Sequence, residues 1–166
     1  MKRVCQSLLA CLLLGASLPG LADNLTASFS VTAKTVGQCA ISANELAFST
    51  AILTPIQGNF DAASTLTVSC SLLSPYSIAL SLGGGPGANC GVRKMSMPGK
   101  IETLNYNLYI DSLRTQIWED GTAGCNNLYV GAGTGLAQPV SVYGRIPPQA
   151  PAVGPFSDTI IATMTF

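Results

Sequence analysis

The segment LTASFSVTAKTV, residues 25–36, carries the most regular pattern in the chain. Apolar residues occupy its odd positions through residue 33, and polar residues stand between them. Successive side chains of a β-strand point to opposite faces, so this pattern predicts a strand with one apolar face. The residues expected on that face are Leu25, Ala27, Phe29, Val31 and Ala33.

The same period of two recurs along the rest of the chain. It predicts strands at 64–71, 76–82, 104–110 and 140–146, separated by clusters of Gly, Pro, Asn and Asp. No apolar stripe of helical period follows residue 22, so the pattern indicates an all-β sandwich. The last ten residues alternate as well, and one face of this final strand should carry Ile160, Ala162, Met164 and Phe166.

The first 22 residues have the pattern of a signal peptide. Lys2 and Arg3 precede an apolar run from Val4 to Leu18, and small residues follow Pro19. The run is shorter than the roughly 20 residues that a membrane-spanning helix needs. We therefore expect cleavage after Ala22, export, and no membrane span in the mature chain. The mature chain then consists of an N-terminal segment, 23–36, and a single domain, 37–166.

Composition excludes several classes of function. Eight basic residues balance eight acidic ones in the 166-residue chain, only 10% of residues are charged, and histidine is absent. The balance of charge argues against binding nucleic acid or anionic lipid through electrostatics. Without histidine there is no Ser-His-Asp or Cys-His pair, no His-containing zinc site and no imidazole switch near neutral pH. We therefore predict that the protein is not an enzyme.

Few motifs point to chemistry, and each has a simpler explanation. The glycine-rich stretches 83–87 and 131–135 lack the Gly-Lys-Ser/Thr of a phosphate loop, so we interpret them as turns. The adjacent carboxylates Glu119 and Asp120 precede a glycine, which is typical of a turn rather than a catalytic pair. Met95 and Met97 could serve as soft Cu(I) ligands, but two thioethers make a poor site. The sequence thus predicts no catalytic residue, cofactor or metal.

Four cysteines remain once the signal peptide is removed, namely Cys39, Cys70, Cys90 and Cys125. Their wide spacing does not match a zinc site, which uses closely spaced pairs. In an oxidising compartment, four cysteines predict two disulfides. Spacing alone leaves all three connectivities open.

The predicted strand at 25–36 lies close to the expected cleavage site, ahead of the first retained cysteine. It could pair within its own sheet as an ordinary first strand, and periodicity alone favours that interpretation. It could also be lent to a neighbouring molecule whose sandwich lacks a strand. These two alternatives lead to very different functions.

Several short motifs resemble the spore coat protein U domain, which is shared by subunits of archaic (Csu-type) chaperone–usher pili. They include FSVTA at 29–33, GQCAIS at 37–42 and LTVSC at 66–70. Further along, LNYNLY at 104–109 and VYGRIP at 142–147 match, as does the ending GPFSDT at 154–159. The WEDG turn at 118–121 departs by one residue from the family's usual pattern. The resemblance covers essentially the whole mature chain.

The resemblance implies an incomplete immunoglobulin-like β-sandwich that is completed by a donor strand from another subunit. The residues Leu25, Ala27, Phe29, Val31 and Ala33 would be that donor strand, and 160–166 would form the edge of the receiving groove. The implied partners are a periplasmic chaperone, an outer-membrane usher and neighbouring subunits, which place the protein in a surface pilus. The resemblance also favours the disulfides Cys39–Cys70 and Cys90–Cys125, although the loops of the second pair vary most in such domains.

The expected function is therefore that of a structural pilus subunit that serves adhesion and biofilm formation. A minor adaptor, an adhesin with carbohydrate or surface binding, and a protective coat protein remain alternatives. A tip adhesin would need an extra receptor-binding domain and no donor strand. The sequence does not identify the receptor, the position in the fibre or the chaperone.

The first testable prediction concerns maturation. We expect the exported protein to begin at Asp23 and its intact mass to lie four hydrogens below that of the reduced chain, because two disulfides form. Mass spectrometry of the exported protein measures both quantities. A peptide map that links Cys39 to Cys90 or to Cys125 would refute the favoured pairing.

Overall fold

The computed structural model describes residues 25–48 and 51–166. It divides the chain into two units, of which the second begins at Thr35, and each is described by itself. The signal peptide predicted at 1–22 and its cleavage site lie outside the described residues. The described part of the chain contains no helix that could cross a membrane.

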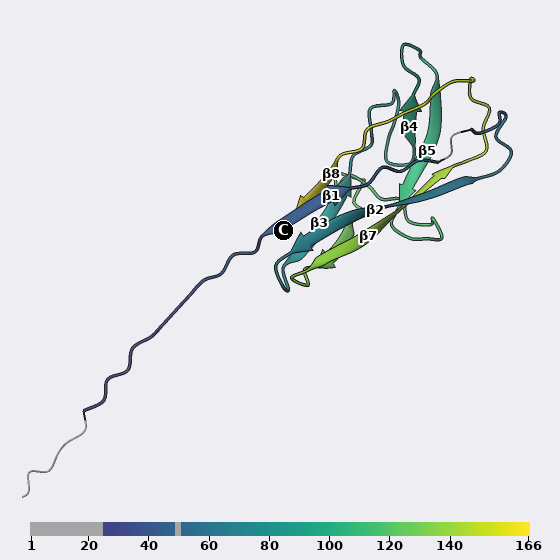
Figure 1. Cartoon of the computed structure of the whole chain (residues 1–166). Coiled ribbons are helices and arrows are strands. Elements are labelled where there is room, and N and C mark those ends of the chain that lie inside the picture. The colour runs from purple at the N-terminus through teal and green to yellow at the C-terminus, as the bar shows by residue number, and fades with distance from the viewer. Residues whose placement is uncertain (1–24, 49–50) are drawn as a thin grey trace, which may run out of the picture. The chain divides into compact units, whose positions relative to one another are not determined.

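The second unit is built from eight strands in two antiparallel sheets (Figure 1). The larger sheet has the spatial order β1 (Cys39–Ala43), β2 (Phe60–Cys70), β7 (Ala137–Ile146), β5 (Thr103–Tyr109) and β4 (Arg93–Ser96). The smaller sheet has the order β6 (Tyr129–Ala132), β3 (Pro75–Leu80) and β8 (Ala162–Thr165). The prediction of an all-β sandwich is confirmed.

The core lies between the two sheets and is made of the alternating side chains that the sequence pattern places on one face. Strands β2, β3, β5 and β7 each contribute such residues, and their polar neighbours point the other way. The buried apolar side chains of these strands are Leu66, Val68, Cys70, Tyr76, Ile78, Leu80, Leu104, Tyr106, Leu108, Val140, Val142 and Ile146.

Two features of the sheets differ from the prediction. Strand β6 runs into the glycine-rich stretch that was interpreted only as a turn. Gly131 lies in this strand. A Cβ there would lie 2.6 Å from the Cζ atom of Tyr76, so glycine is needed for the ring to pack directly on the backbone. At the C-terminus, Ile160, Ala162 and Met164 pack against the core, whereas Phe166 is 62% exposed.

The N-terminal segment forms no strand in this chain. Residues 25–34 have no regular secondary structure, and Leu25, Phe29 and Val31 are 97%, 87% and 83% exposed. Residues 35 and 36 are likewise outside any strand. Among the pairings that the described residues make, none involves this segment. Its strand-like pattern is therefore not matched by any strand pairing among residues 25–48 and 51–166.

Two buried polar side chains connect the sheets. The Trp118 indole N–H donates to the Ile78 carbonyl of β3 over 2.7 Å, and its backbone N–H donates to Leu108 of β5 over 2.8 Å. Arg93 of β4 is fully buried and donates to the carbonyls of Leu80, Ser81 and Trp118 over 2.6–2.9 Å. Burial in an apolar environment lowers the pKa of Arg93. These bonds pair carbonyls that would otherwise be buried without a partner.

The structure contains both disulfides that the resemblance favoured, Cys39–Cys70 and Cys90–Cys125. The first joins the opposed residues that pair β1 with β2, because Cys39 faces Cys70 in the register of these strands. The second connects two loops, one before β4 and one between β5 and β6.

We expect the double variant Cys39→Ala, Cys70→Ala to lose about 2–5 kcal/mol of folding free energy, as is typical for a native disulfide. Urea unfolding at high dilution, followed by the fluorescence of Trp118, measures this loss, because the chain has a single tryptophan and it is fully buried. An unchanged unfolding midpoint would show that the pairing of β1 with β2 does not depend on this bond.

Candidate functional site

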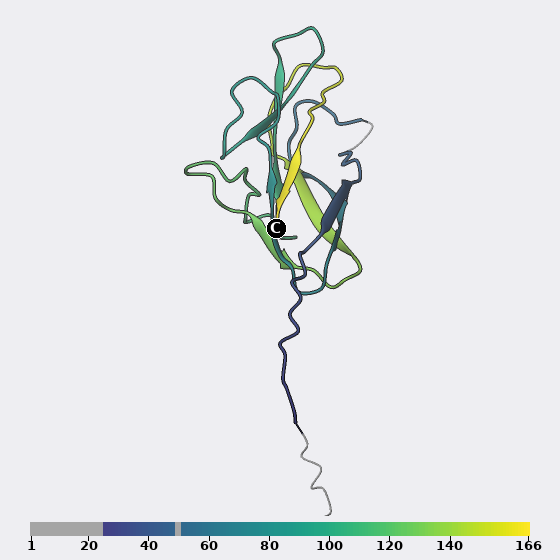
Figure 2. The same cartoon turned by 90° about the vertical axis from the view of Figure 1, so that its left-hand side faces the viewer.

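A large apolar groove opens along one side of the sandwich, where the two sheets do not meet. Its volume is about 1120 Å³. Strand β8 bounds it in one sheet, and the segment that follows β1 bounds it in the other. Figure 2 shows β8 and β1 at the two sides, with β7 visible between them.

The groove reaches down to the hydrophobic core. Its floor is formed by core side chains from β2, β3, β5 and β7, and its walls by residues 43–48 and 51–54 on one side and 151–160 on the other. The floor residues are Leu66, Leu80, Leu104, Tyr106, Leu108, Val142 and Ile146. An apolar groove of this size is typical of a binding site.

The edge of β8 exposes unpaired backbone groups along one side of the groove. β8 pairs with β3, and the Ser81 N–H donates to the Ile161 carbonyl over 2.9 Å, so alternate residues from Ile161 onward turn their backbone toward β3. Neighbouring residues of a strand direct these groups to opposite sides. The backbone groups of Ala162 and Met164 therefore point to the open edge, while their side chains pack on the core.

The edge of β1 is arranged in the same way. Bonds from Ser71 N–H to Gln38 O and from Asn44 N–H to Thr65 O turn the even residues of β1 toward β2. The odd residues Cys39 and Ile41 then turn their backbone outward, and their side chains pack against the core. Within the described residues neither edge has a strand next to it, so each offers a row of donors and acceptors.

The two sheets are in contact beside the Cys39–Cys70 disulfide. This bond holds β1 to β2, and the Cys70 sulfur lies 4.0 Å from the Met164 sulfur of β8. Since Cys70 carries no proton in the disulfide, this is a packing contact between the two sheets.

Asp158 positions the other end of the β8 wall. Its carboxylate accepts bonds from the Tyr106 hydroxyl at 2.7 Å and from the Gly84 and Thr159 N–H groups at 2.8 Å. Burial, together with this bond, raises the pKa of Tyr106 above its ordinary value. Gly83 is required beside it, since its φ is +85° and a Cβ there would collide with the carboxylate. Sequence reasoning gave Asp158 no role of its own.

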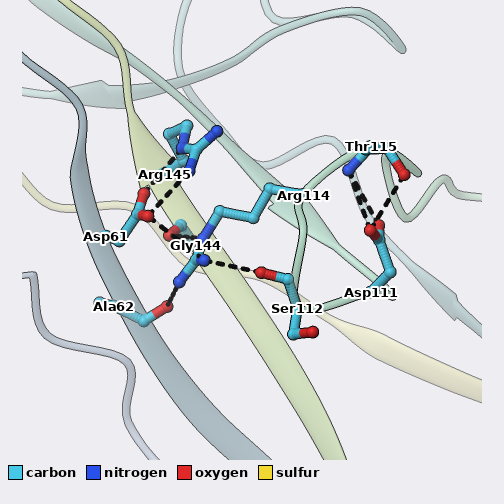
Figure 3. Close-up of polar contacts among 8 residues, drawn as sticks. All are labelled: Asp61, Ala62, Asp111, Ser112, Arg114, Thr115, Gly144 and Arg145. Carbon is cyan, nitrogen blue, oxygen red and sulfur yellow. Dashed lines mark hydrogen bonds and ion pairs between the residues drawn. The ribbon is translucent and has the colours of Figure 1, made fainter.

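A second group of polar residues lies on the outer face of the larger sheet (Figure 3). Arg145 of β7 donates to both oxygens of Asp61 of β2, over 2.7 and 2.8 Å, and the hydrogen bond lowers the pKa of Asp61. Arg114 extends from a loop to Asp61 and to the carbonyls of Gly144 and Ala62. Every charge here is engaged by a neighbour, so the cluster fastens the loop to β2 and β7 and is not a binding site.

No site for a metal emerges from the part of the chain that the structure describes. It contains no group of three or more His, Cys, Asp and Glu side chains that could hold an ion. Met95 lies in β4 and packs against the core, and Met97 is buried beyond the end of that strand. The groove is the candidate site, and it suits an extended apolar peptide segment.

The residues that the sequence marked fall into two sets. Ile160 and Ala162 line the groove, Met164 packs against the core, and Phe166 is largely exposed. The residues on the predicted donor face, Leu25, Ala27, Phe29, Val31 and Ala33, are all exposed. The opposite wall, residues 43–48 and 51–54, was missed because its sequence shows no regular alternation.

Comparison with solved structures supports the incomplete fold. A chain of the CsuC–CsuE chaperone–tip adhesion subunit pre-assembly complex, from the archaic chaperone–usher Csu pili of Acinetobacter baumannii, superposes with a TM-score of 0.57. The identity is 21%, and the match covers 79% of this chain and 40% of that one. The likeness shows a shared fold, and this chain spans less than half of that relative.

Comparison of the sequence with protein families gives a clear result, although a search of curated proteins found no match. The profile of the Spore Coat Protein U domain matches residues 25–163, which include residues 25–36, the groove lining and the first half of β8. This is a structural family without enzymatic activity. The chain belongs to the Spore Coat Protein U domain family.

Proposed function

We propose that this protein is a structural subunit of an archaic chaperone–usher pilus, in which the N-terminal segment of one subunit fills the groove of the next. The observation that carries the proposal is an apolar groove with unpaired strand edges on both sides. A single β-strand can satisfy both edges and cover the floor at once. The same chain contains a segment with the pattern of such a strand and no strand partner of its own.

The chemistry of the segment is complementary to that of the groove. Five apolar side chains on one face, at residues 25 to 33, meet a floor of Leu, Val, Ile and Tyr side chains. Fully burying a large apolar side chain contributes about 1.5–3 kcal/mol, so Leu25, Phe29 and Val31 together supply several kcal/mol before the cost of ordering the segment. Backbone hydrogen bonds to both edges add to this affinity.

Donation between copies also explains how a fibre forms. The donor and the groove are different surfaces of one molecule, so the contact is heterologous and propagates head to tail without closing. The family resemblance implies two helper proteins: a periplasmic chaperone that covers the groove before assembly, and an outer-membrane usher where the exchange takes place. The fibre would then lie on the cell surface and serve adhesion and biofilm formation.

Three other roles use the same fold. A minor adaptor subunit, an adhesin that binds a carbohydrate or another surface, and a protective coat protein differ from a rod subunit in their position and partners. Among the described residues, the groove with its open edges is the binding feature that the geometry defines best. It favours the polymerising subunit.

The sharpest test changes one residue on the donor face. Phe29→Asp should abolish surface fibres, because it forces a charge into an apolar groove where no partner awaits it. It should leave the complex with the chaperone almost intact, because the chaperone fills the groove while the donor segment stays free. Immunoblots of surface fibres and co-purification with the chaperone measure the two outcomes.

Ser28→Asp and Ser30→Asp are the matched controls, since they introduce the same charge on the opposite face of the same segment. Both should retain fibres far better than Phe29→Asp. Equal loss of fibres in all three variants, or loss of the chaperone complex with Phe29→Asp, would contradict the donor-strand assignment.

A further prediction concerns the chain without a partner. Expressed alone in the periplasm, it should aggregate, be degraded or polymerise on itself, because its groove leaves backbone and apolar groups exposed. Co-expression with the cognate chaperone should yield a soluble one-to-one complex, which size-exclusion chromatography with light scattering detects. A stable lone monomer whose residues 25–36 are protected from hydrogen exchange would argue for a complete fold.

A further inference from the structure

Exposed apolar side chains gather at the end of the sandwich where the domain begins. We call this group the entry cap, and all of its members are at least 69% exposed. They come from the start of the second unit and from the turns β2–β3 and β6–β7. The entry cap consists of Val36, Leu72, Leu73 and Leu136.

Backbone hydrogen bonds hold these three segments together. The Leu73 N–H donates to the Gly133 carbonyl over 2.8 Å, and the Ser71 N–H donates to the Gln38 carbonyl over 2.9 Å. The Cβ atom of Leu72 lies 3.9 Å from the position a Cβ would take at Gly135. The segments 35–38, 71–74 and 133–136 contain no charged residue. The cap is therefore an organised, uncharged apolar surface.

A second group of exposed apolar residues, which we call the mouth rim, surrounds the other end of the groove. It consists of Leu53, Ile101 and Val153, all at least 84% exposed. Thr54 donates to the Pro151 carbonyl over 3.1 Å, and a Cβ at Gly154 would touch Met97, so the three loops that carry these residues are neighbours. Leu53 and Val153 also line the groove itself.

The direction of β8 places the cap and the rim at opposite ends. The chain passes from the rim loop 151–155 along β8 to Met164, which contacts Cys70 next to the β2–β3 turn. In a complete immunoglobulin sandwich, the strand that follows this one in the sheet is antiparallel to it. A donor strand antiparallel to β8 enters the groove beside the recipient's cap and leaves it at the recipient's mouth rim.

The chain between donor and domain is too short to keep two subunits apart. From Ala33, the last donor residue, to Cys39, the first residue of β1, there are 39 − 33 = 6 Cα–Cα steps. Six fully extended residues span about 20 Å. The entry cap of the donating subunit must therefore lie close to the mouth rim of the receiving one, so apolar surface faces apolar surface.

We propose that the entry cap docks on the mouth rim of the next copy of this chain, forming a second contact between successive subunits. This inference rests on the proposed function, because the donor strand brings the two surfaces together. Burial of the apolar side chains of both surfaces adds to the donor-strand interaction and fixes how one subunit is oriented on the next. The occupant of the cap is thus a second copy, not a foreign protein.

Site-specific photo-crosslinking in assembled fibres tests the contact. The photoreactive residue p-benzoylphenylalanine is placed at Leu136 or at Leu72 in the entry cap. The matched control is Leu113, which is equally exposed but lies in the loop on the outer face of the larger sheet. Illumination should yield dimers from both cap positions, and peptide mapping should place the adducts in segments 51–55, 97–101 or 151–155 of the neighbour.

The outcomes separate this inference from the function on which it rests. Fibres that form normally but give no more dimer from the cap positions than from Leu113, or adducts outside the three rim segments, would overturn the cap–rim contact alone. Failure of the unsubstituted chain to form fibres would overturn the proposed function and this contact with it. The reciprocal probe at Val153 should yield adducts in segments 71–74 or 133–136, and their absence counts against the contact.

Discussion

The structure depends on one constraint: backbone N–H and C=O groups next to an apolar core must be paired. In this domain two sheets meet along one side and stay apart along the other, where β1 and β8 each leave a row of these groups without a strand. Because the floor between them is apolar, water is a poor substitute for a strand. The groove therefore fits one kind of partner best, which is an extended segment with alternating apolar residues.

A sandwich that lacks a strand needs other means to keep its groove in shape. Three polar side chains supply them, of which Trp118 and Arg93 are fully buried, and each is bonded to backbone or to a neighbouring side chain at short distance. Trp118 connects β3 with β5, Arg93 gathers carbonyls at the end of β3, and Asp158 holds the start of the β8 wall to Tyr106. Because the groove is already ordered before a strand binds, the free energy of binding is not reduced by the cost of ordering the recipient.

Much of this architecture could be predicted from the sequence, because most strands have one face in the core. Alternation identified β2, β3, β5 and β7 with their buried residues, and also the region of β8. It did not identify short strands such as β4 and β6, because so few residues show no clear period and Gly131 is typical of a turn. The groove wall at 43–48 and 51–54 was missed because an irregular segment has no periodic pattern. Arg93 and Asp158 gave no signal either, because a charge normally indicates exposure, and only the fold reveals the carbonyls and hydroxyl that surround them.

The position of the Cys39–Cys70 disulfide has a mechanical consequence. In a fibre, a pulling force reaches each domain through the linker that ends at Cys39, the first residue of a short edge strand. Such a load would otherwise peel β1 from β2 one hydrogen bond at a time. The disulfide at the start of β1 passes the load directly to β2. This is the longest strand, and it pairs with β1 on one side and with β7 on the other. The edge strand β1 is thereby relieved of tension.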